Sequence, residues 1–372
     1  MKFILKILIL LIPIKRINKK FTVALVKIDN IGDYILFRNF LPFIRHSQKY
    51  SSTNIVLIGN YAWKELAEYF DTDYVDSFFW IYPTQYAKNK WYRLKTLWQI
   101  KRLNINNLIN TVHSRNWVID EIVAFNNAQK KITCEGDDVN LTPEIKKKSD
   151  AFFQTIIPSL PSSVFEFERN RFFIEKLIDE KIKLERAFFS LNKVGKIENS
   201  ISIFIGAQSP LRQWSPIKFA HLILAIHKDY PNYFYQILGG KNDKKNSNDI
   251  MNFINKAPNS IVINNLCGQT TLVDLVSCIQ KTRLLISNET SAIHIAAAVD
   301  TQSICIANGE RFMRFSPYPQ SMTNKIITIF PDDSFYEISN KNIYAEKFCY
   351  QSSIDIDTIT VDRVLQFIKT IL

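Results

Sequence analysis

Short apolar segments rich in β-branched residues alternate with segments of helical periodicity along most of this chain. In its first half, apolar runs that predict buried strands lie at residues 21–28, 54–58, 75–80 and 107–112, and the sequence between them predicts helices. Strands that alternate with helices in this way predict a parallel sheet covered by helices on both faces. The sequence therefore predicts an α/β fold.

The alternation is interrupted near the middle of the chain and then restarts. Residues 158–196 contain prolines, serines and a charged helical segment, and a new strand segment begins at Ser200. A chain of 372 residues is long enough for two domains. We therefore expect two doubly wound, Rossmann-like domains that face a central cleft. The expected parts are a basic apolar segment at 1–20, a first domain at 21–175, a linker region at 176–198, a second domain at 199–355 and a C-terminal helix at 356–372.

The formal net charge of +12 narrows the classes of partner. Such a charge suits a nucleic acid, an anionic membrane surface or a phosphorylated ligand, and part of it is ordinary solvated surface. The sequence has no zinc knuckle, RNA-binding signature or long basic tail, so we expect no nucleic-acid partner. The five cysteines are odd in number and lack metal-binding or redox spacing, which indicates thiols in a reducing compartment.

The first twenty residues combine an apolar run with basic residues. The run at 7–14 is far shorter than the ~20 residues that a membrane-spanning helix needs, and four lysines and arginines follow it. Basic residues beside an apolar helix suit the cytoplasmic face of an anionic bilayer. We expect this segment to lie on a membrane surface, and the alternative is a packed helix that leads into the first strand.

Ligands of doubly wound sheets bind outside the carboxyl ends of the strands, and several motifs occupy such positions here. Gly32 and Asp33 follow the first predicted strand. The Asp33 carboxylate could act as a general base towards a hydroxyl group. The alternative is a helix-capping aspartate, which is a common structural feature.

A second motif follows the first strand of the second half. It contains Gly206 and Ala207, which could open backbone amides to a phosphate, and Arg212, which could pair with a diphosphate. An ordinary loop with a surface arginine is the alternative.

Two more motifs in the second half lie between a strand and a helix. Thr290 or Ser291 is expected to cap a helix whose N-terminus is an anion site, and His294 lies one turn further. Gly268 and Thr270 could lie near a nucleotide base, with Thr270 or Thr271 as the helix cap, although a plain connection explains them equally well.

Weaker candidates lie elsewhere. His113 and Arg115 follow a strand of the first half and could face an acceptor, or form a solvated loop. The aspartate pairs 71/73 and 355/357 are interpreted as turn and cap residues. No histidine–cysteine cluster has metal-ligand spacing, so we expect no metal and no cofactor.

The order of these motifs resembles glycosyltransferase family 9, the heptosyltransferases of lipopolysaccharide core assembly. The matching residues are Lys27 with Ile31-Gly32-Asp33; Gly206-Ala207 with Arg212-Gln213-Trp214; Asn265, Leu266, Gly268, Thr270 and Leu272; and Asn288-Glu289-Thr290-Ser291 with His294 and residues 296–298. The chain departs from the family pattern at Arg212, where the family has lysine, at Glu289, where it has aspartate, and at Ser291, where it has glycine. These departures leave the donor open.

The resemblance implies a GT-B fold and an inverting sugar transfer without metal. It makes Asp33 the base that deprotonates the acceptor hydroxyl and Arg212 the cation that stabilises the leaving diphosphate. The first domain then binds the acceptor and the second binds the nucleotide sugar. The implied donor-binding residues are Gly206, Ala207, Gly268, Thr270, Glu289, Thr290, Ser291 and His294, and the expected acceptor-binding residues are Gly32, His113 and Arg115.

The expected substrates are a nucleotide-diphosphate sugar, with heptose or another hexose-like sugar, and a lipopolysaccharide-core or other glycolipid or oligosaccharide acceptor. The expected location is the cytoplasm, peripheral to the inner face of a bacterial inner membrane. A nucleotide-sugar epimerase of the same fold and a degenerate protein that only binds a nucleotide sugar are the alternatives.

Overall fold

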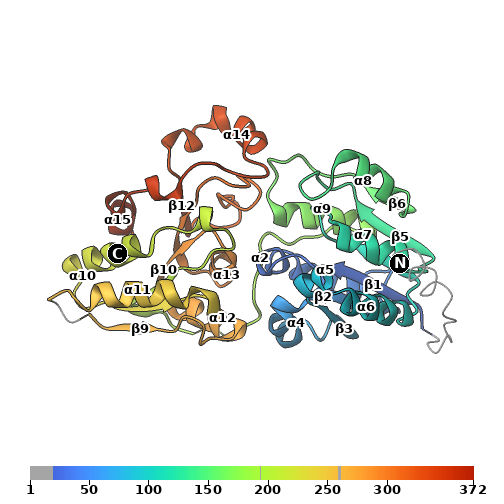
Figure 1. The fold of residues 1–372 in the computed structure, drawn as a ribbon, viewed down its shortest axis with the longest axis horizontal. Coiled ribbons are helices and arrows are strands. Elements are labelled where there is room, and N and C mark those ends of the chain that lie inside the picture. The colour runs from blue at the N-terminus through green and yellow to red at the C-terminus, as the bar shows by residue number, and fades with distance from the viewer. Residues whose placement is uncertain (1–19, 193, 259–260) are drawn as a thin grey trace. The chain divides into compact units, whose positions relative to one another are not determined.

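The computed structural model describes residues 20–192, 194–258 and 261–372, which divide into two compact units (Figure 1). Unit 1 contains the chain up to Leu160 together with Glu168–Lys183, and unit 2 contains Pro161–Phe167 and Leu184–Leu372. The chain therefore changes units within the segment that interrupts the strand–helix alternation.

Unit 1 is built on a six-stranded parallel sheet with the order β3-β2-β1-β4-β5-β6. Its first strand, β1, is buried along its whole length, as its continuous apolar sequence predicts. The strands are β1 (Thr22–Lys27), β2 (Asn54–Asn60), β3 (Ser77–Ile81), β4 (Asn107–Asn110), β5 (Lys130–Cys134) and β6 (Thr155–Ile157).

Unit 2 repeats this arrangement, with the order β12-β11-β10-β7-β8-β9 in a second parallel sheet. The strands are β7 (Ile197–Phe204), β8 (Phe234–Leu238), β9 (Ile263–Asn265), β10 (Thr282–Asn288), β11 (Gln302–Ile306) and β12 (Ile326–Ile329). Two doubly wound parallel sheets confirm the expected α/β class.

Helices connect the strands in both units. In unit 1 they are α2 (Ile31–Ile35), α3 (Leu41–His46), α4 (Lys64–Phe70), α5 (Pro83–Lys88), α6 (Lys90–Arg102), α7 (Trp117–Phe125) and α8 (Pro143–Asp150), and α9 (Glu166–Ile178) runs from unit 2 into unit 1. In unit 2 they are α10 (Pro216–Asp229), α11 (Lys244–Ile254), α12 (Leu272–Lys281), α13 (Ser291–Ala298), α14 (Lys341–Lys347) and α15 (Val361–Lys369). Short 3-10 turns lie at Arg38–Phe40, Tyr61–Trp63, Pro210–Arg212, Lys241–Asp243, Asp333–Tyr336, Ile338–Asn340 and Ile356–Thr358.

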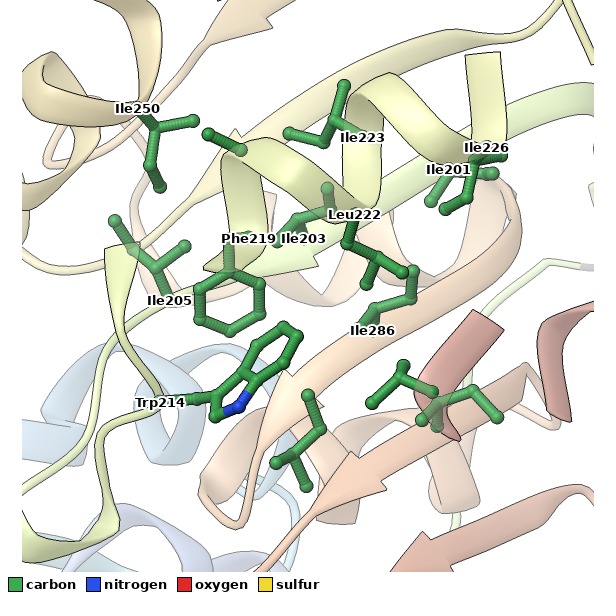
Figure 2. Packing of buried hydrophobic residues seen from close by; sticks show 14 of the residues in the cluster. Ile201, Ile203, Ile205, Trp214, Phe219, Leu222, Ile223, Ile226, Ile250 and Ile286 are labelled. Atoms are coloured by element: carbon green, nitrogen blue, oxygen red, sulfur yellow. The ribbon is translucent and has the colours of Figure 1, made fainter. Parts of the chain in front are cut away.

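The core of unit 2 lies between its sheet and helix α10 (Figure 2). Phe219, Leu222 and Ile226 on α10 recur at helical spacing and are fully buried against isoleucines of β7 and β10. Trp214 lies at the edge of this core and contacts Phe219 edge to face at 4.9 Å between ring centroids. The core therefore holds the end of the loop that follows β7.

The C-terminal helix α15 belongs to the same core. It buries Val364 and Ile368, which pack in the cluster with α10. Unit 1 has an equivalent core, in which Leu97 and Ile100 of α6 pack with Ile119 and Ile122 of α7 against the sheet.

The chain between β1 and β2 does not form a single helix but is divided into α2, a 3-10 turn and α3, with Pro42 in the first turn of α3. No helix in the part of the chain that the structure describes is long and apolar enough to span a membrane. Residues 1–19 of the expected membrane-surface segment lie outside the described residues.

Candidate active site

Each sheet reverses its strand order at one point, between β1 and β4 in unit 1 and between β7 and β10 in unit 2. The carboxyl ends of the two strands at such a switch point flank the crevice where doubly wound folds bind ligands. The sequence motifs follow these four strands. Gly32-Asp33 follows β1, His113-Ser114-Arg115 follows β4, the loop at 205–214 follows β7, and Glu289-Thr290-Ser291 follows β10.

Asp33 lies in the first turn of α2, and 8% of its surface is exposed. Its Oδ2 accepts a hydrogen bond from the backbone amide of Asn30, the N-cap residue, at 3.3 Å. The side chain thus has a capping role, although at the third helical position rather than at the N-cap. A hydrogen bond at one oxygen leaves the carboxylate able to accept a proton.

The loop before Asp33 is held from its neighbouring strand. Asn60, at the end of β2, donates from Nδ2 to the carbonyl of Asp29 at 3.0 Å, and Trp63 donates from Nε1 to the same carbonyl at 3.1 Å. The Trp63 ring stacks on Tyr34 at 3.9 Å between centroids. A Cβ on Gly59 would lie 2.3 Å from the Trp63 ring, so this close packing requires glycine there.

The buried carboxylate of Asp71 also holds α2 in place, through Tyr34. Asp71 accepts a hydrogen bond from the Tyr34 hydroxyl at 2.6 Å and is paired with the Arg38 guanidinium through two contacts of 2.7 and 3.0 Å. Asp71 is 1% exposed and Arg38 is 3% exposed. The interpretation of Asp71 as turn and cap chemistry is therefore wrong for its side chain, which is the centre of an ion pair. Asp355, in contrast, caps the turn at 356–358 as expected.

Lys27, the last residue of β1, is fully buried below this loop. Its ammonium lies 2.8 Å from a carboxylate oxygen of Asp29. Because a buried charge is costly unless it is paired, this contact favours one conformation of the chain between β1 and Asp33.

The two candidate acceptor residues after β4 differ in their environments. His113 lies beside a small cavity of about 20 Å³, and its Nε2 is 3.3 Å from the Arg169 guanidinium. That volume holds about one water molecule. Arg115 is fully buried, and its guanidinium pairs with Asp150 at 2.5 Å. An acceptor can reach Arg115 only if the surrounding packing opens.

In unit 2, the loop after β7 is held by Asn288 and Asn308, which are both fully buried. Asn288 donates from Nδ2 to the carbonyl of Ile205 at 2.8 Å and accepts from the amide of Trp214 at 3.0 Å. Asn308 donates to the carbonyl of Leu211 at 3.1 Å. The ends of β10 and β11 therefore fix the backbone on both sides of Arg212.

Two glycines at the carboxyl edge of this sheet allow close approach of backbone segments. A Cβ on Gly206 would lie 2.4 Å from the carboxylate of Asp243. Gly268 has a φ of +69°, a left-handed conformation that favours glycine, and its amide donates to the carbonyl of Gly239 at 2.9 Å. The structure gives Ala207 and Thr270 no such contact, and the helix cap after Gly268 is Thr271.

Arg212, Glu289 and Glu310 form a charged cluster at the switch point of unit 2. The guanidinium of Arg212 lies 3.9 Å from Glu310, and the Ser316 hydroxyl donates to Oε1 of Glu289. Nε of Arg212 and Oε2 of Glu289 are two of the fifteen buried side-chain atoms of the described residues that have no hydrogen-bond partner, and they belong to one cluster. Buried polar atoms are nearly always paired in native proteins, so such atoms at a strand edge indicate a ligand site.

The pKa of the Glu289 carboxyl group lies above its ordinary value, and burial is the largest cause. Burial raises the pKa of Glu289, while the charge of Arg212 and the hydrogen bond from Ser316 oppose that rise. Glu310 adds to it as a second carboxylate nearby.

The helix after β10 begins with the expected cap. Thr290 is the N-cap of α13, and its Oγ1 accepts a hydrogen bond from the amide of Ala292 at 3.3 Å. Ser291 is the first helical residue. His294, one turn further, is 5% exposed, and its Nδ1 lies 2.6 Å from the Tyr318 hydroxyl. Burial, with the nearby charge of Arg212, lowers the pKa of His294 to about 3, so the ring is neutral at physiological pH.

Several residues of this cluster were not found from the sequence. Asn308 and Glu310 follow β11, so applying the strand-end rule to that strand would have found them. Ser316 and Tyr318 come from a loop without a recognisable pattern. Over residues 20–192, 194–258 and 261–372, no group of three or more His, Cys, Asp or Glu side chains is placed to hold a metal ion.

Residues 172–334 match the model of a family described as glycosyltransferase family 9 (heptosyltransferase). The match covers less than half of the chain, and it shows that this segment is similar to glycosyltransferase family 9. The three motifs of unit 2 lie inside the matched segment, whereas Ile31-Gly32-Asp33 lies outside it.

Solved structures with the same two-domain, GT-B fold extend the similarity to nearly the whole chain. A glycosyl transferase family 9 protein from Veillonella parvula is 12% identical, with 96% of this chain and 98% of that chain covered and a TM-score of 0.68. ADP-heptose lipopolysaccharide heptosyltransferase II from E. coli is 13% identical, with 94% of this chain and 98% of that chain covered and a TM-score of 0.64. E. coli heptosyltransferase WaaC with ADP is 12% identical, with 94% of this chain and 97% of that chain covered and a TM-score of 0.66. No curated protein sequence matches the chain.

The Asp71 ion pair predicts a large effect on stability. Replacing Asp71 with alanine leaves Arg38 buried without its carboxylate, and we expect the free energy of unfolding to fall by about 3–5 kcal/mol. Urea denaturation measures the change. Asp73→Ala, an exposed aspartate of the same turn, should change stability by less than about 0.5 kcal/mol. Equal effects of the two substitutions would contradict the assignment of Asp71 as the buried partner.

His294 predicts a pH dependence of stability. Between a folded pKa of about 3 and an unfolded pKa of about 6.5, the unfolded state binds the additional proton. The stabilisation is therefore complete above pH 6.5 and is lost as the pH falls towards 3. Below pH 6.5, the unfolding free energy of the wild type should fall faster than that of His294→Gln, by up to about 1.4 kcal/mol per pH unit.

Urea denaturation at a series of pH values checks this. The control is His221→Gln, which replaces an exposed histidine of the same unit. Parallel pH profiles of the wild type and His294→Gln would show that the ring titrates normally in the folded protein.

Proposed function

We propose that this protein is an inverting, metal-independent glycosyltransferase. It moves a sugar, heptose or another hexose-like sugar, from a nucleotide-diphosphate donor to a lipopolysaccharide-core or other glycolipid or oligosaccharide acceptor. The observation that carries the proposal is the pair of buried, unpartnered polar atoms on Arg212 and Glu289 at the switch point of unit 2. An anion with hydroxyl groups, such as a sugar diphosphate, is the class of ligand that would satisfy both atoms.

The diphosphate binds at the carboxyl edge of the second sheet. The N-terminus of α13, with Thr290 and Ser291, provides backbone amides and the positive end of a helix dipole. Arg212 supplies the full positive charge, and its guanidinium can bond two phosphate oxygens at once. As the bond to the sugar breaks, negative charge grows on the leaving diphosphate, and these groups stabilise it.

Glu289 binds the donor sugar rather than the phosphates. Its Oε1 is already occupied by the Ser316 hydroxyl, so Oε2 is the atom available to a sugar hydroxyl. His294 is neutral and buried, and it shapes the wall of the site with Tyr318 instead of contributing charge. Gly206, Ala207, Gly268 and Thr270 complete the donor side.

Asp33 acts as the general base of the reaction. It takes the proton from the acceptor hydroxyl while that oxygen attacks the anomeric carbon and the diphosphate leaves from the opposite face, which inverts the configuration. Gly32 allows the acceptor to approach the backbone beside Asp33, and His113 belongs to the acceptor side of unit 1 with Arg115 as its buried support. Arg212 and the α13 amides neutralise the leaving group, so no divalent metal and no cofactor are required.

The proposed location follows from the proposed acceptor. A glycolipid core is assembled at the inner face of a bacterial inner membrane, so the enzyme works in the cytoplasm, peripheral to that membrane. The net charge of +12 favours an anionic membrane surface as a partner.

Asp33→Asn tests the catalytic assignment. Asparagine keeps an oxygen that can accept the hydrogen bond from Asn30, but it cannot take a proton. We expect kcat to fall by about 10²–10⁴-fold with little change in the melting temperature. Arg212→Gln should lower kcat by about 10²–10³-fold, because it removes the charge that stabilises the leaving diphosphate. Transfer of sugar from a nucleotide sugar to a lipopolysaccharide-core acceptor is the assay.

Three results would contradict parts of the proposal. Wild-type activity should be unchanged by EDTA, and an EDTA-sensitive reaction restored by a divalent ion would overturn the metal-independent mechanism. Unchanged transfer by a folded Asp33→Asn variant would overturn the base assignment. Conversion of the nucleotide sugar without any acceptor would instead indicate an epimerase.

A further inference from the structure

Helix α6 covers one face of the unit 1 sheet (Figure 1). Its sequence contains a row of aromatic and basic residues. Trp91, Lys95, Trp98 and Arg102 are separated by four, three and four residues, which places them on one face of an α-helix. Ile100 lies on the other side and is buried in the unit 1 core. The outer face of α6 is therefore distinct from the face that stabilises the fold.

The row combines one fully presented ring, Trp91, and one partly buried ring, Trp98, with positive charge. Trp91 is 80% exposed, the largest fraction among the exposed large hydrophobic side chains that the structure describes. The Arg102 guanidinium lies 4.6 Å from the centroid of the Trp98 ring, so a charge and a ring are presented together. Lys88 and Lys90, just before and at the start of α6, are also exposed. We name these six residues the α6 surface: Lys88, Lys90, Trp91, Lys95, Trp98 and Arg102.

The charge of this region has one sign. The stretch from Ser77 to Ile119 contains no aspartate or glutamate and seven lysines and arginines, of which all but Lys101 and Arg115 reach the surface. Two acidic residues follow in α7: Asp120, which is buried, and Glu121, which lies 3.8 Å from Arg93. A surface of this kind is complementary to a densely anionic partner.

Two more exposed aromatic side chains lie at the carboxyl edge of the same sheet. Tyr61 and Tyr82 follow β2 and β3, stack at 4.1 Å between centroids, and are 41% and 38% exposed. Tyr82 is joined to α6, since its amide donates to the Tyr92 hydroxyl at 3.1 Å. The edge that carries the candidate acceptor residues is therefore continuous with the helix that carries Trp91.

We propose that the α6 surface docks on the anionic phospholipid surface of a membrane, with the Trp91 ring at the level of the headgroups. Tryptophan favours this interface because its ring is amphipathic, and lysine and arginine side chains favour the phosphate layer. The exposed face of a helix is convex, which suits a broad plane, whereas single-stranded nucleic acids bind in grooves lined by rings.

This surface is separate from the basic apolar segment at residues 1–20. The inference extends the membrane partner of the proposed function, and it rests on that function only in giving the docked enzyme a membrane-bound acceptor. Lipid binding is measured without sugar transfer, so the two can fail independently. An enzyme inactive towards all glycolipids that still binds vesicles through α6 would refute the proposed function alone.

Sedimentation of the full-length protein with lipid vesicles tests the docking surface. The vesicles contain phosphatidylcholine alone or mixed with phosphatidylglycerol. We expect binding to the anionic vesicles only, and weaker binding as salt is added. The Lys90→Glu/Lys95→Glu variant should bind at least tenfold more weakly, because each lysine near the surface contributes to the attraction.

The matched control is Lys147→Glu/Lys148→Glu, which makes the same charge change on exposed residues of α8 in the same unit. It should bind like the wild type. Brominated lipids should quench the tryptophan fluorescence of the wild type more strongly than that of Trp91→Ala, although the chain has six tryptophans. Circular dichroism and thermal unfolding establish that each variant is folded.

Equal loss of binding in both lysine variants would overturn the proposal, because the effect would then follow net charge alone. Unchanged binding of Lys90→Glu/Lys95→Glu would overturn it as well, since the membrane contact would then lie elsewhere on the chain. A third contradictory result would be full displacement of the protein from vesicles by a single-stranded oligonucleotide together with unchanged brominated-lipid quenching in Trp91→Ala, which would identify a nucleic-acid surface.

Discussion

The side-chain amide of Asn288 holds the candidate donor site together. It is fully buried at the end of β10, where it binds the carbonyl of Ile205 on one side and the amide of Trp214 on the other. Backbone groups buried at the end of a strand must find partners, and one asparagine satisfies a donor and an acceptor of the same loop. The position of Arg212 within that loop therefore depends on a strand that is 74 residues away in the sequence.

In unit 1 an asparagine side chain likewise binds the backbone of the loop after the first strand. Asn60, at the end of β2, binds the carbonyls of Ile28 and Asp29 in the loop that leads to Asp33. In both units a buried asparagine from a neighbouring strand fixes the chain just after the first strand of the sheet. Parallel sheets expose loop backbone at their carboxyl edge, and a short amide side chain can reach it without adding charge. The proposed function gives the charged residues of these loops, Asp33 and Arg212, to the substrates.

Burial influences the protonation and pairing of the ionisable groups in unit 2 as much as the distances between them do. His294 is kept neutral, because its burial and the charge of Arg212 both oppose protonation. Glu289 is buried next to the same arginine with one oxygen unpaired. The replacement of the family's aspartate by glutamate therefore puts a longer carboxyl group into a site with little solvent. In the proposed function, the donor sugar places a hydroxyl group at Oε2 of Glu289, so the length of this side chain bears on the choice of donor.

Much of the fold was predictable, because buried parallel strands have continuous apolar sequences, such as residues 21–28. Three strands were missed. One of them, β12, does have an apolar sequence, Ile-Ile-Thr-Ile, whereas the other two lack that signal. β5 begins with two lysines, and β6 has only three residues. The candidate site was predictable to the extent that it follows strands, as with Glu289 and Thr290.

The rest depends on partners that are distant in sequence. Asp71 and Asp73 look alike in the sequence, and only the position of Arg38 in the fold separates a buried ion pair from an exposed turn residue. Arg115 has the sequence context of a loop, but Asp150 and Phe153 enclose it. The neutral state of His294 likewise depends on Tyr318 and on burial that no local pattern records.

The most direct test of this account is nucleotide binding by the purified protein, measured as the shift in melting temperature with a panel of nucleotide diphosphates and their sugars. The account predicts that a nucleotide-diphosphate sugar at about 100 times its dissociation constant stabilises the wild type by about 2.7 kcal/mol. It also predicts that Arg212→Gln loses most of this shift while Lys218→Gln, a neighbouring lysine on α10, retains it. A wild type that no nucleotide or nucleotide sugar stabilises, or an Arg212→Gln variant that responds like the wild type, would contradict the assignment of the donor site.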